Sequence, residues 1–213
     1  MNTLRITEIF LSLQGESRSI GFPTVFVRLT GCPLRCNYCD SAYAFSGGEV
    51  LELSDVLEKV ECCGVKHVCV TGGEPLAQRE CLNLLRQLCD KGYEVSLETS
   101  GALDVSEVDP RVIKVMDLKT PSSGEEPKNL YANINYLSER DQLKFVIANR
   151  LDYLWAKEVL AVQLQKTKAE VLFSPSFEEI KPHQLADWIV EDKLAVRFQL
   201  QLHKILWGDE PGR

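Results

Sequence analysis

The sequence predicts an α/β fold built on a parallel β-sheet, and two observations support this prediction. Short runs of apolar or β-branched residues alternate with longer segments of helical periodicity along the whole chain, as in consecutive βαβ units. About six such units fit into 213 residues, which is fewer than the eight of a complete (β/α)8 barrel. We therefore expect a sheet that is either open and doubly wound or curved into a partial barrel.

Strands are expected where short runs are rich in β-branched and aromatic residues. In chain order these runs are Thr24–Leu29, Val68–Val70, Glu94–Leu97, Val112–Met116, Leu143–Ile147, Val171–Phe173 and Ala195–Leu202. Helices are expected where apolar residues recur every three to four positions. These segments are Ser54–Cys62, Arg79–Lys91, Leu151–Leu164 and His183–Val190. Ser54 is the expected N-cap of the first helix, Gly92 is expected to end the second, and segment 120–129 is expected to be a surface loop.

The composition narrows the class of protein. The chain carries 24 Lys and Arg against 31 Asp and Glu, a formal net charge of −7, which argues against a nucleic-acid or membrane surface. No apolar run reaches the length of a transmembrane helix, and residues 1–16 lack the pattern of a signal peptide. Because 45% of the residues are hydrophobic, we expect a single domain over residues 1–213. Because a signal-peptide pattern is lacking, we expect the protein in the cytoplasm with reduced thiols.

The eight cysteines divide into two groups by their spacing. Cys32, Cys36 and Cys39 lie within the loop 31–41 that follows a predicted strand, whereas the other five are scattered through apolar segments and are expected to pack in the core. Three thiolates in one loop suit a 4Fe-4S cluster that keeps one iron open to a ligand. A structural zinc site normally takes four ligands. Zinc binding and simple packing remain alternatives for these three thiols.

Further polar motifs follow other predicted strands directly. They are Thr71–Pro75, Glu98–Gly101 and Asp117–Lys119. Parallel α/β proteins bind ligands at the carboxyl ends of their strands, where the loops converge over the sheet. We therefore expect these motifs and the cysteine loop to form one site.

Arg28 is unusual because it interrupts an apolar predicted strand. Phe26, Arg28 and Thr30 share one face of that strand, and the alternate residues share the other. An arginine inside a parallel sheet needs a buried anion as its partner. That anion is either the carboxylate of a substrate or the carboxylate of a structural salt bridge.

The motifs together resemble those of radical S-adenosylmethionine enzymes. The CxxxCxxC loop is similar to the cluster-binding signature of that superfamily, and Gly72-Gly73-Glu74-Pro75 is similar to its glycine-rich motif. The upstream Leu13-Gln14-Gly15-Glu16, with Leu202-His203-Lys204 near the end, resembles the 7-carboxy-7-deazaguanine synthase family of the queuosine pathway. This resemblance implies an α/β fold with a parallel-stranded partial (β/α)6 barrel of the radical SAM type, or an abbreviated form of it.

The resemblance also implies a reaction and its cofactors. The family is a group of carbon–nitrogen lyases that use a 4Fe-4S cluster, S-adenosyl-L-methionine and Mg²⁺. A 5′-deoxyadenosyl radical takes a hydrogen atom from 6-carboxy-5,6,7,8-tetrahydropterin, and the ring contracts to 7-carboxy-7-deazaguanine with loss of ammonia. The implied partners are the small-molecule pterin, an electron donor such as flavodoxin and a second copy in a homodimer, with no nucleic acid and no membrane.

Site residues follow from the matching motifs, as what the resemblance implies. Cys32, Cys36 and Cys39 would hold the cluster, and Ser41 would bind Mg²⁺ where the family usually has Thr. The residues implied for S-adenosylmethionine are Tyr38, Cys39, Asp40, Gly72, Gly73, Glu74, Glu98, Ser100, Asp117, Leu118, Lys119, Ser174, Pro175, Ser176 and Phe177. Those implied for the pterin are Leu13, Gln14, Gly15, Glu16, Arg28, Thr71 and His203. Ser17 departs from the family, in which many members have Gly.

Two alternative functions stay open at this point. A glycyl-radical-enzyme activase is also small and carries the same cysteine spacing, but it acts on a glycine of a partner protein. A zinc-stabilised binding module would bind metal through the same thiols and catalyse nothing. Loading with iron and sulfide distinguishes the second alternative from an enzyme, and turnover of the pterin distinguishes the first.

Overall fold

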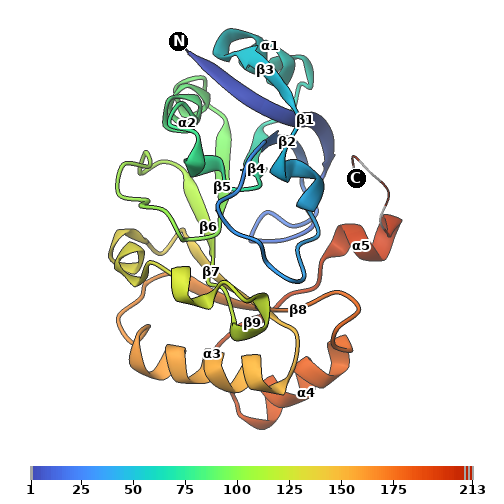
Figure 1. Cartoon of the computed structure of the whole chain (residues 1–213), viewed down its shortest axis with the longest axis vertical. Helices are drawn as coiled ribbons and strands as arrows, with labels where there is room; N and C mark the ends of the chain where they lie inside the picture. Colours follow the sequence, from blue (N-terminus) through green and yellow to red (C-terminus); the bar gives the residue numbers. More distant parts are fainter. Residues whose placement is uncertain (1, 209, 211, 213) are drawn as a thin grey trace.

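The structure is a computed structural model that describes residues 2–208, 210 and 212. Its strands join one nine-stranded sheet in the order β3-β1-β2-β4-β5-β6-β7-β8-β9 (Figure 1). The strands are β1 (Thr3–Leu13), β2 (Pro23–Leu29), β3 (Glu49–Glu52), β4 (His67–Gly72), β5 (Glu94–Thr99), β6 (Ile113–Asp117), β7 (Gln142–Ile147), β8 (Glu170–Pro175) and β9 (Arg197–Phe198). From β2 to β9 neighbouring strands are parallel, whereas β1 runs antiparallel to both β2 and β3.

Helices α1 to α4 lie on the outer side of the curved sheet, and the short α5 lies apart from them (Figure 1). The helices are α1 (Leu53–Cys62), α2 (Cys81–Asp90), α3 (Arg150–Val162), α4 (Pro182–Glu191) and α5 (Leu202–Trp207). Figure 1 shows α1 and α2 along one half of the sheet and α3 and α4 along the other, with the strands curving around the middle of the molecule. The carboxyl ends of the parallel strands therefore face a common space, as predicted.

Two apolar clusters pack these helices onto the sheet. In the first cluster, Val25, Val27 and Leu29 of β2 contact the apolar faces of α1 and α2. In the second, Phe145 and Phe173 pack at the centre of the residues that α3 and α4 contribute. Because side chains alternate along a strand, the residues between these core positions face the concave side of the sheet. Among the described residues, no helix has both the length and the apolar character needed to cross a membrane.

Most of the predicted elements are confirmed. The first six predicted strands and all four predicted helices are present, and no bound is shifted by more than two residues. Gly92 follows α2 with φ +86°, the left-handed conformation expected of a residue that ends a helix. The predicted N-cap is wrong, because Glu52 occupies that position and α1 begins at Leu53. The connections from β5 to β6 and from β6 to β7 contain no α-helix within the described residues.

The last predicted strand, Ala195–Leu202, is mostly wrong. Only Arg197–Phe198 pairs with β8, and Leu202 already begins α5. The chain leaves the sheet because Gln199 donates to the Ser17 carbonyl and accepts from the Ser17 N–H, at 2.9 and 2.7 Å. The Leu202 N–H then donates to the Gly15 carbonyl at 2.9 Å. These bonds attach the end of the chain to the loop after β1.

Candidate active site

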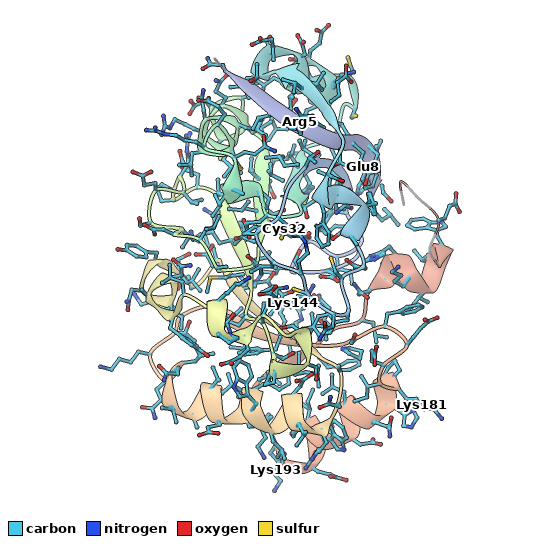
Figure 2. All side chains as sticks on the ribbon, in the orientation of Figure 1. Arg5, Glu8, Cys32, Lys144, Lys181 and Lys193 are labelled. Atoms are coloured by element: carbon cyan, nitrogen blue, oxygen red, sulfur yellow. The ribbon has the colours of Figure 1, made fainter. Side chains whose placement is uncertain are left out.

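A large cavity opens at the carboxyl ends of the parallel strands. Its volume is about 960 Å³, and β1, β2, β4, β5, β6, β7 and β8 or the loops after them contribute to its lining. Figure 2 shows Cys32 and Lys144 in the middle of the molecule, whereas Lys181 and Lys193 lie at the periphery. All of the predicted site residues line this cavity except Gly15, Glu74 and Leu118. Leu118 is fully buried in the core under α3, so its side chain cannot contact a ligand.

The cysteine loop is fixed to the rest of the site by backbone hydrogen bonds. The Gly31 N–H donates to the Ala44 carbonyl and the Glu74 N–H donates to the Gly31 carbonyl, both at 2.8 Å. The Asn37 N–H donates to the Ser123 carbonyl at 3.0 Å, and the Arg35 N–H donates to Glu125 at 2.5 Å. Segment 120–129 was expected to be a surface loop, but these bonds make it a support of the cysteine loop.

The three clustered thiols fit a multi-iron group. Cys32, Cys36 and Cys39 are free, half-buried and line the same cavity. Burial raises the pKa of Cys32 and of Cys36, and the neighbouring thiols add to the effect. No three His, Cys, Asp or Glu side chains within the described residues are placed around one metal ion. A cluster presents its irons at separate corners, so its ligands need not converge on one point.

The glycine pair after β4 permits a close approach of two backbones. A Cβ on Gly73 would lie 2.3 Å from the Gly31 carbonyl oxygen, and one on Gly72 would lie 2.3 Å from the Leu29 carbonyl oxygen. Both distances are far inside van der Waals contact, so only glycine fits at either position. Gly72 therefore lets the end of β4 approach β2, Gly73 lets the next residue approach the cysteine loop, and both also line the cavity.

Glu74 differs from its expected role as a cofactor ligand. Its side chain has no solvent exposure, and its carboxylate accepts from the Leu76 N–H at 3.0 Å and the Ser100 N–H at 2.7 Å. The hydroxyls of Thr99 and Ser100 donate to the same carboxylate at 3.0 and 2.5 Å. Thr99 and Ser100 line the cavity and Glu74 does not. Glu74 thus positions residues that can contact a ligand.

Two polar groups on β6 and β8 face the cavity with unused hydrogen-bonding capacity. The Asp117 carboxylate pairs with Lys119 through Oδ2, at 3.1 Å, while its Oδ1 atom is buried and has no partner among the described residues. The Ser174 hydroxyl is buried and unpartnered in the same way. Burial opposes the charge of Lys119, yet the Asp117 charge raises the pKa of Lys119 overall. Unpartnered buried polar atoms are costly, so a ligand that bonds to them gains affinity.

On the opposite side, the loop after β1 brings a second polar group into the cavity. Gln14 accepts from the Glu16 N–H at 3.2 Å through Oε1, and its Nε2 group is buried without a partner among the described residues. Glu16 forms a short ion pair with Lys144 of β7 and accepts from Gln201 at 2.8 Å. Burial acts to raise the pKa of Glu16, but the charge of Lys144 lowers it below its usual value.

Gly15 matters through its contact with His203. A Cβ on Gly15 would lie 2.0 Å from His203 Nδ1, so the absence of a side chain lets the imidazole reach the cavity. His203 lies on α5 and not at the end of a strand. Burial lowers the pKa of His203 even though Glu16 and Asp40 act to raise it. The imidazole is therefore mostly neutral near pH 7 and has both a donor and an acceptor nitrogen.

Arg28 has an anionic partner on the neighbouring strand β1, and that partner is the half-buried Glu8. Arg28 Nε donates to Glu8 Oε1 at 2.7 Å, and the Tyr43 hydroxyl donates to the same oxygen at 2.8 Å. The guanidinium lies between the Phe10 and Tyr43 rings, at 5.9 and 5.7 Å from their centroids. This is the structural salt bridge that the sequence left open. Both Nη groups make no hydrogen bond to described residues, and Arg28 still lines the cavity.

Thr71 of β4 and Glu98 of β5 are joined by a hydrogen bond at the cavity wall. The Thr71 hydroxyl donates to Glu98 at 2.8 Å, and both residues line the cavity.

Ser41 lies at the end of the cysteine loop with its hydroxyl oxygen 3.8 Å from the Cys39 sulfur, and Asp40 lies beside it. Burial raises the pKa of Tyr38 to about 12, and its hydroxyl shares a hydrogen bond with Thr120 at 3.1 Å.

Three polar residues of the site were not predicted from the sequence, namely Lys144, Glu8 and Gln201. Lys144 carries the same signal as Arg28, because it is a basic residue inside an otherwise apolar parallel strand. Glu8 and Gln201 gave no local signal, since β1 was not predicted and residue 201 fell in a predicted strand. Ser17 has φ +67°, the left-handed conformation that glycine adopts most easily, which fits the Gly that the family resemblance implies at this position.

Comparisons with known proteins identify the family of the chain. The model of the Radical SAM superfamily matches residues 26–121. The 7-carboxy-7-deazaguanine synthases of Chlorobaculum tepidum and Koribacter versatilis are 44% and 40% identical to the chain, with 97% of the chain covered in both cases and 96% and 98% of those proteins.

Solved structures support the fold. The crystal structure of QueE from Escherichia coli superposes with a TM-score of 0.78 at 24% identity, over 94% of this chain and 95% of that one. Streptococcus suis SuiB has a TM-score of 0.57 at 18% identity, over 80% of this chain and 47% of its own. Near full-length identity of 44% to a curated relative is decisive for membership. The chain belongs to the 7-carboxy-7-deazaguanine synthase family of radical SAM enzymes.

Proposed function

We propose that the chain converts 6-carboxy-5,6,7,8-tetrahydropterin to 7-carboxy-7-deazaguanine with loss of ammonia, as a step of queuosine and 7-deazapurine biosynthesis. The observation that carries this proposal is the near full-length similarity to synthases of that name. The cavity supports it, because one space holds the cysteine loop together with the polar group of Gln14, Glu16 and His203. The glycyl-radical-enzyme activase and the zinc module have no comparable support.

Cys32, Cys36 and Cys39 would hold a 4Fe-4S cluster, and the loops after β4, β5, β6 and β8 would hold S-adenosylmethionine. When bound, these groups supply the radical that removes a hydrogen atom from the substrate. The backbone carbonyls of Gly72 and Gly73 are acceptors suited to the methionyl ammonium. Asp117 Oδ1 and the Ser174 hydroxyl offer unpartnered polar atoms to the adenosyl part.

The residues of the chain bind and orient the pterin. Gln14 Nε2 lacks a partner and can donate to the 4-oxo group, while the ionised Glu16 can accept from the N–H edge of the 2-amino-4-oxo ring. The Nη groups of Arg28 are suited to the substrate carboxylate, because Glu8 already fixes the guanidinium through Nε. Burial of these groups excludes water from the reaction space.

Mg²⁺ binding beside the cluster is part of the proposal. Ser41 and Asp40 place a hydroxyl and a carboxylate next to each other on the cavity wall, and oxygen donors are the ligands that Mg²⁺ prefers. Ser41 lacks the methyl group that restricts the side chain of Thr, so weaker metal binding is expected than in members with Thr. The homodimer, the cytoplasmic location and a flavodoxin-like electron donor stay predictions.

The test is turnover after anaerobic reconstitution with iron and sulfide. The reduced protein is incubated with S-adenosylmethionine, Mg²⁺ and 6-carboxytetrahydropterin, and the products are separated by liquid chromatography. We expect 7-carboxy-7-deazaguanine in amounts that exceed the enzyme. Formation of 5′-deoxyadenosine only in the presence of a partner protein would instead identify an activase. Stoichiometric zinc without a visible iron–sulfur absorbance would contradict both enzymatic functions.

A further inference from the structure

A buried lysine on strand β7, Lys144, lies between the two polar groups of the cavity. Lys144 pairs with Glu16 from the loop after β1, and the two side chains are only 12% and 10% exposed. On its other side Lys144 is opposite Asp117 in the parallel pairing of β6 and β7. An unpaired lysine at this depth would be costly, and so would an unpaired glutamate. The pair is therefore a built feature of the site and not a surface contact.

We propose that Lys144 is a positioning residue, whose ammonium group keeps the Glu16 carboxylate ionised and directed toward the pterin so that it accepts from the amino edge of the ring. This inference rests on the proposed function. The second Glu16 oxygen is held by Gln201, which leaves the remaining lone pairs as the only acceptors available for a ligand. A protonated Glu16 would present an O–H donor to N–H donors of the ring, and binding would weaken.

The charges around the pair support this role. Glu16 faces Lys144 from β7 and His203 from α5, and the charges of both lower its pKa, Lys144 the more strongly. Lys144 faces Glu16, Asp117 of β6 and Glu98 of β5, and these carboxylates raise its pKa against the effect of burial. Since His203 is itself mostly neutral, Lys144 is the main cation that opposes protonation of Glu16.

The test is the pH dependence of substrate KM in the reconstituted holoenzyme. K144M removes the charge and keeps the length of the side chain, so burial acts on Glu16 without an opposing cation and raises its pKa by about three units or more. We expect KM to rise about tenfold at pH 6.5, with kcat nearly unchanged and the difference from wild type narrowing toward pH 8.5. Lys144→Arg, which keeps the charge, should restore most of the affinity. A K144M enzyme whose KM equals that of the wild type at low pH overturns the proposal.

Lys114 offers a matched control on the neighbouring strand β6. It is also a buried strand lysine, paired with Asp141 at 3.2 Å, but it lies outside the cavity lining. K114M removes a comparable ion pair, so it is expected to lower stability and leave KM and its pH profile unchanged. If K114M gives the same profile as K144M, the effect is a general loss of packing and the proposal is wrong.

A double variant keeps the test decisive if K144M alone does not fold. Glu16→Gln mimics the protonated carboxyl, so adding K144M to E16Q should raise KM no further. A further tenfold loss would mean that Lys144 contacts the substrate directly, which contradicts the proposal. An infrared spectrum gives a readout without turnover, because K144M should gain a carboxylic-acid C=O stretch that K144M/E16Q lacks. That measurement still tests Lys144 if the wild type makes no deazaguanine, a result that overturns the proposed function alone.

Discussion

Replacing Glu74 by Gln tests whether this buried carboxylate organises the loop after β5. Four donors converge on it, namely the N–H groups of Leu76 and Ser100 and the hydroxyls of Thr99 and Ser100. An amide has one acceptor oxygen and adds two N–H donors of its own. Leu76 and Ser100 donate to different oxygens of the carboxylate. In either orientation of the amide, one of these two backbone N–H groups therefore faces the NH2 group of Gln and not an oxygen.

The expected loss of unfolding free energy follows from the number of donors left without an acceptor. One buried donor left without an acceptor costs about 1 to 3 kcal/mol, and the remaining hydrogen bonds weaken because the acceptor is no longer charged. We therefore expect E74Q to lower the free energy of unfolding by about 2 kcal/mol. With a urea m-value of about 2 kcal/mol/M, the unfolding midpoint shifts by about 1 M.

The assay is urea unfolding followed by circular dichroism, with wild type and variants at equal cluster occupancy. The matched control is Glu58→Gln, which makes the same chemical change at an exposed position of α1. E58Q should stay within about 0.5 kcal/mol of the wild type. An E74Q protein as stable as E58Q would refute the assignment of Glu74 as the acceptor that fixes Thr99 and Ser100.

Three further changes are expected to have measurable effects. Ser17→Gly should stabilise the fold by about 0.5 to 1 kcal/mol in urea unfolding, because φ +67° strains a residue with a Cβ, whereas Ser17→Ala should bring no gain. Cys36→Ala should abolish the iron–sulfur absorbance after reconstitution. Cys62→Ala should retain it, because Cys62 lies outside the cavity; the prediction that it packs in the core is wrong, since it is exposed. His203 has a lowered pKa in the fold, so the unfolded state binds more protons and unfolding free energy should fall as the pH drops below the unperturbed value of 6.5. His203→Gln should flatten that slope, and an unchanged slope would assign the pH dependence to other groups.

The parallel strands β2 and β4 to β8 could be predicted from the sequence because their signal is local. Apolar runs such as β4 and β7 are buried on both faces, and their composition alone distinguishes them from loops. β1 was missed because its register shifts between Ile6 and Glu8, which breaks the alternation expected of a strand with one buried face. β3 is short and mostly exposed, and only its pairing with β1 makes it a strand.

The same distinction explains which parts of the site were predicted. The cysteine spacing is set within one loop, so it could be interpreted without the fold. The partners of the charged side chains could not be predicted, because they lie far away in the sequence. Glu16 and its partner Lys144 are 128 positions apart, and Glu98 and its partner Thr71 are 27 apart. Glu74 shows the converse case, since a motif pointed to a polar residue and only the structure revealed that its polarity is used internally.

The charges in the cavity select for more than a negative ligand. Arg28 pairs with Glu8, Lys119 with Asp117 and Lys144 with Glu16, so each of these bases already has a carboxylate partner. A simple anion would have to compete with that partner and would gain little. A ligand with its own donors and acceptors can instead bond to the unused atoms of both members of a pair. This arrangement favours a pterin, with a carboxylate at one end and a 2-amino-4-oxo edge at the other, in a chain whose net charge is −7.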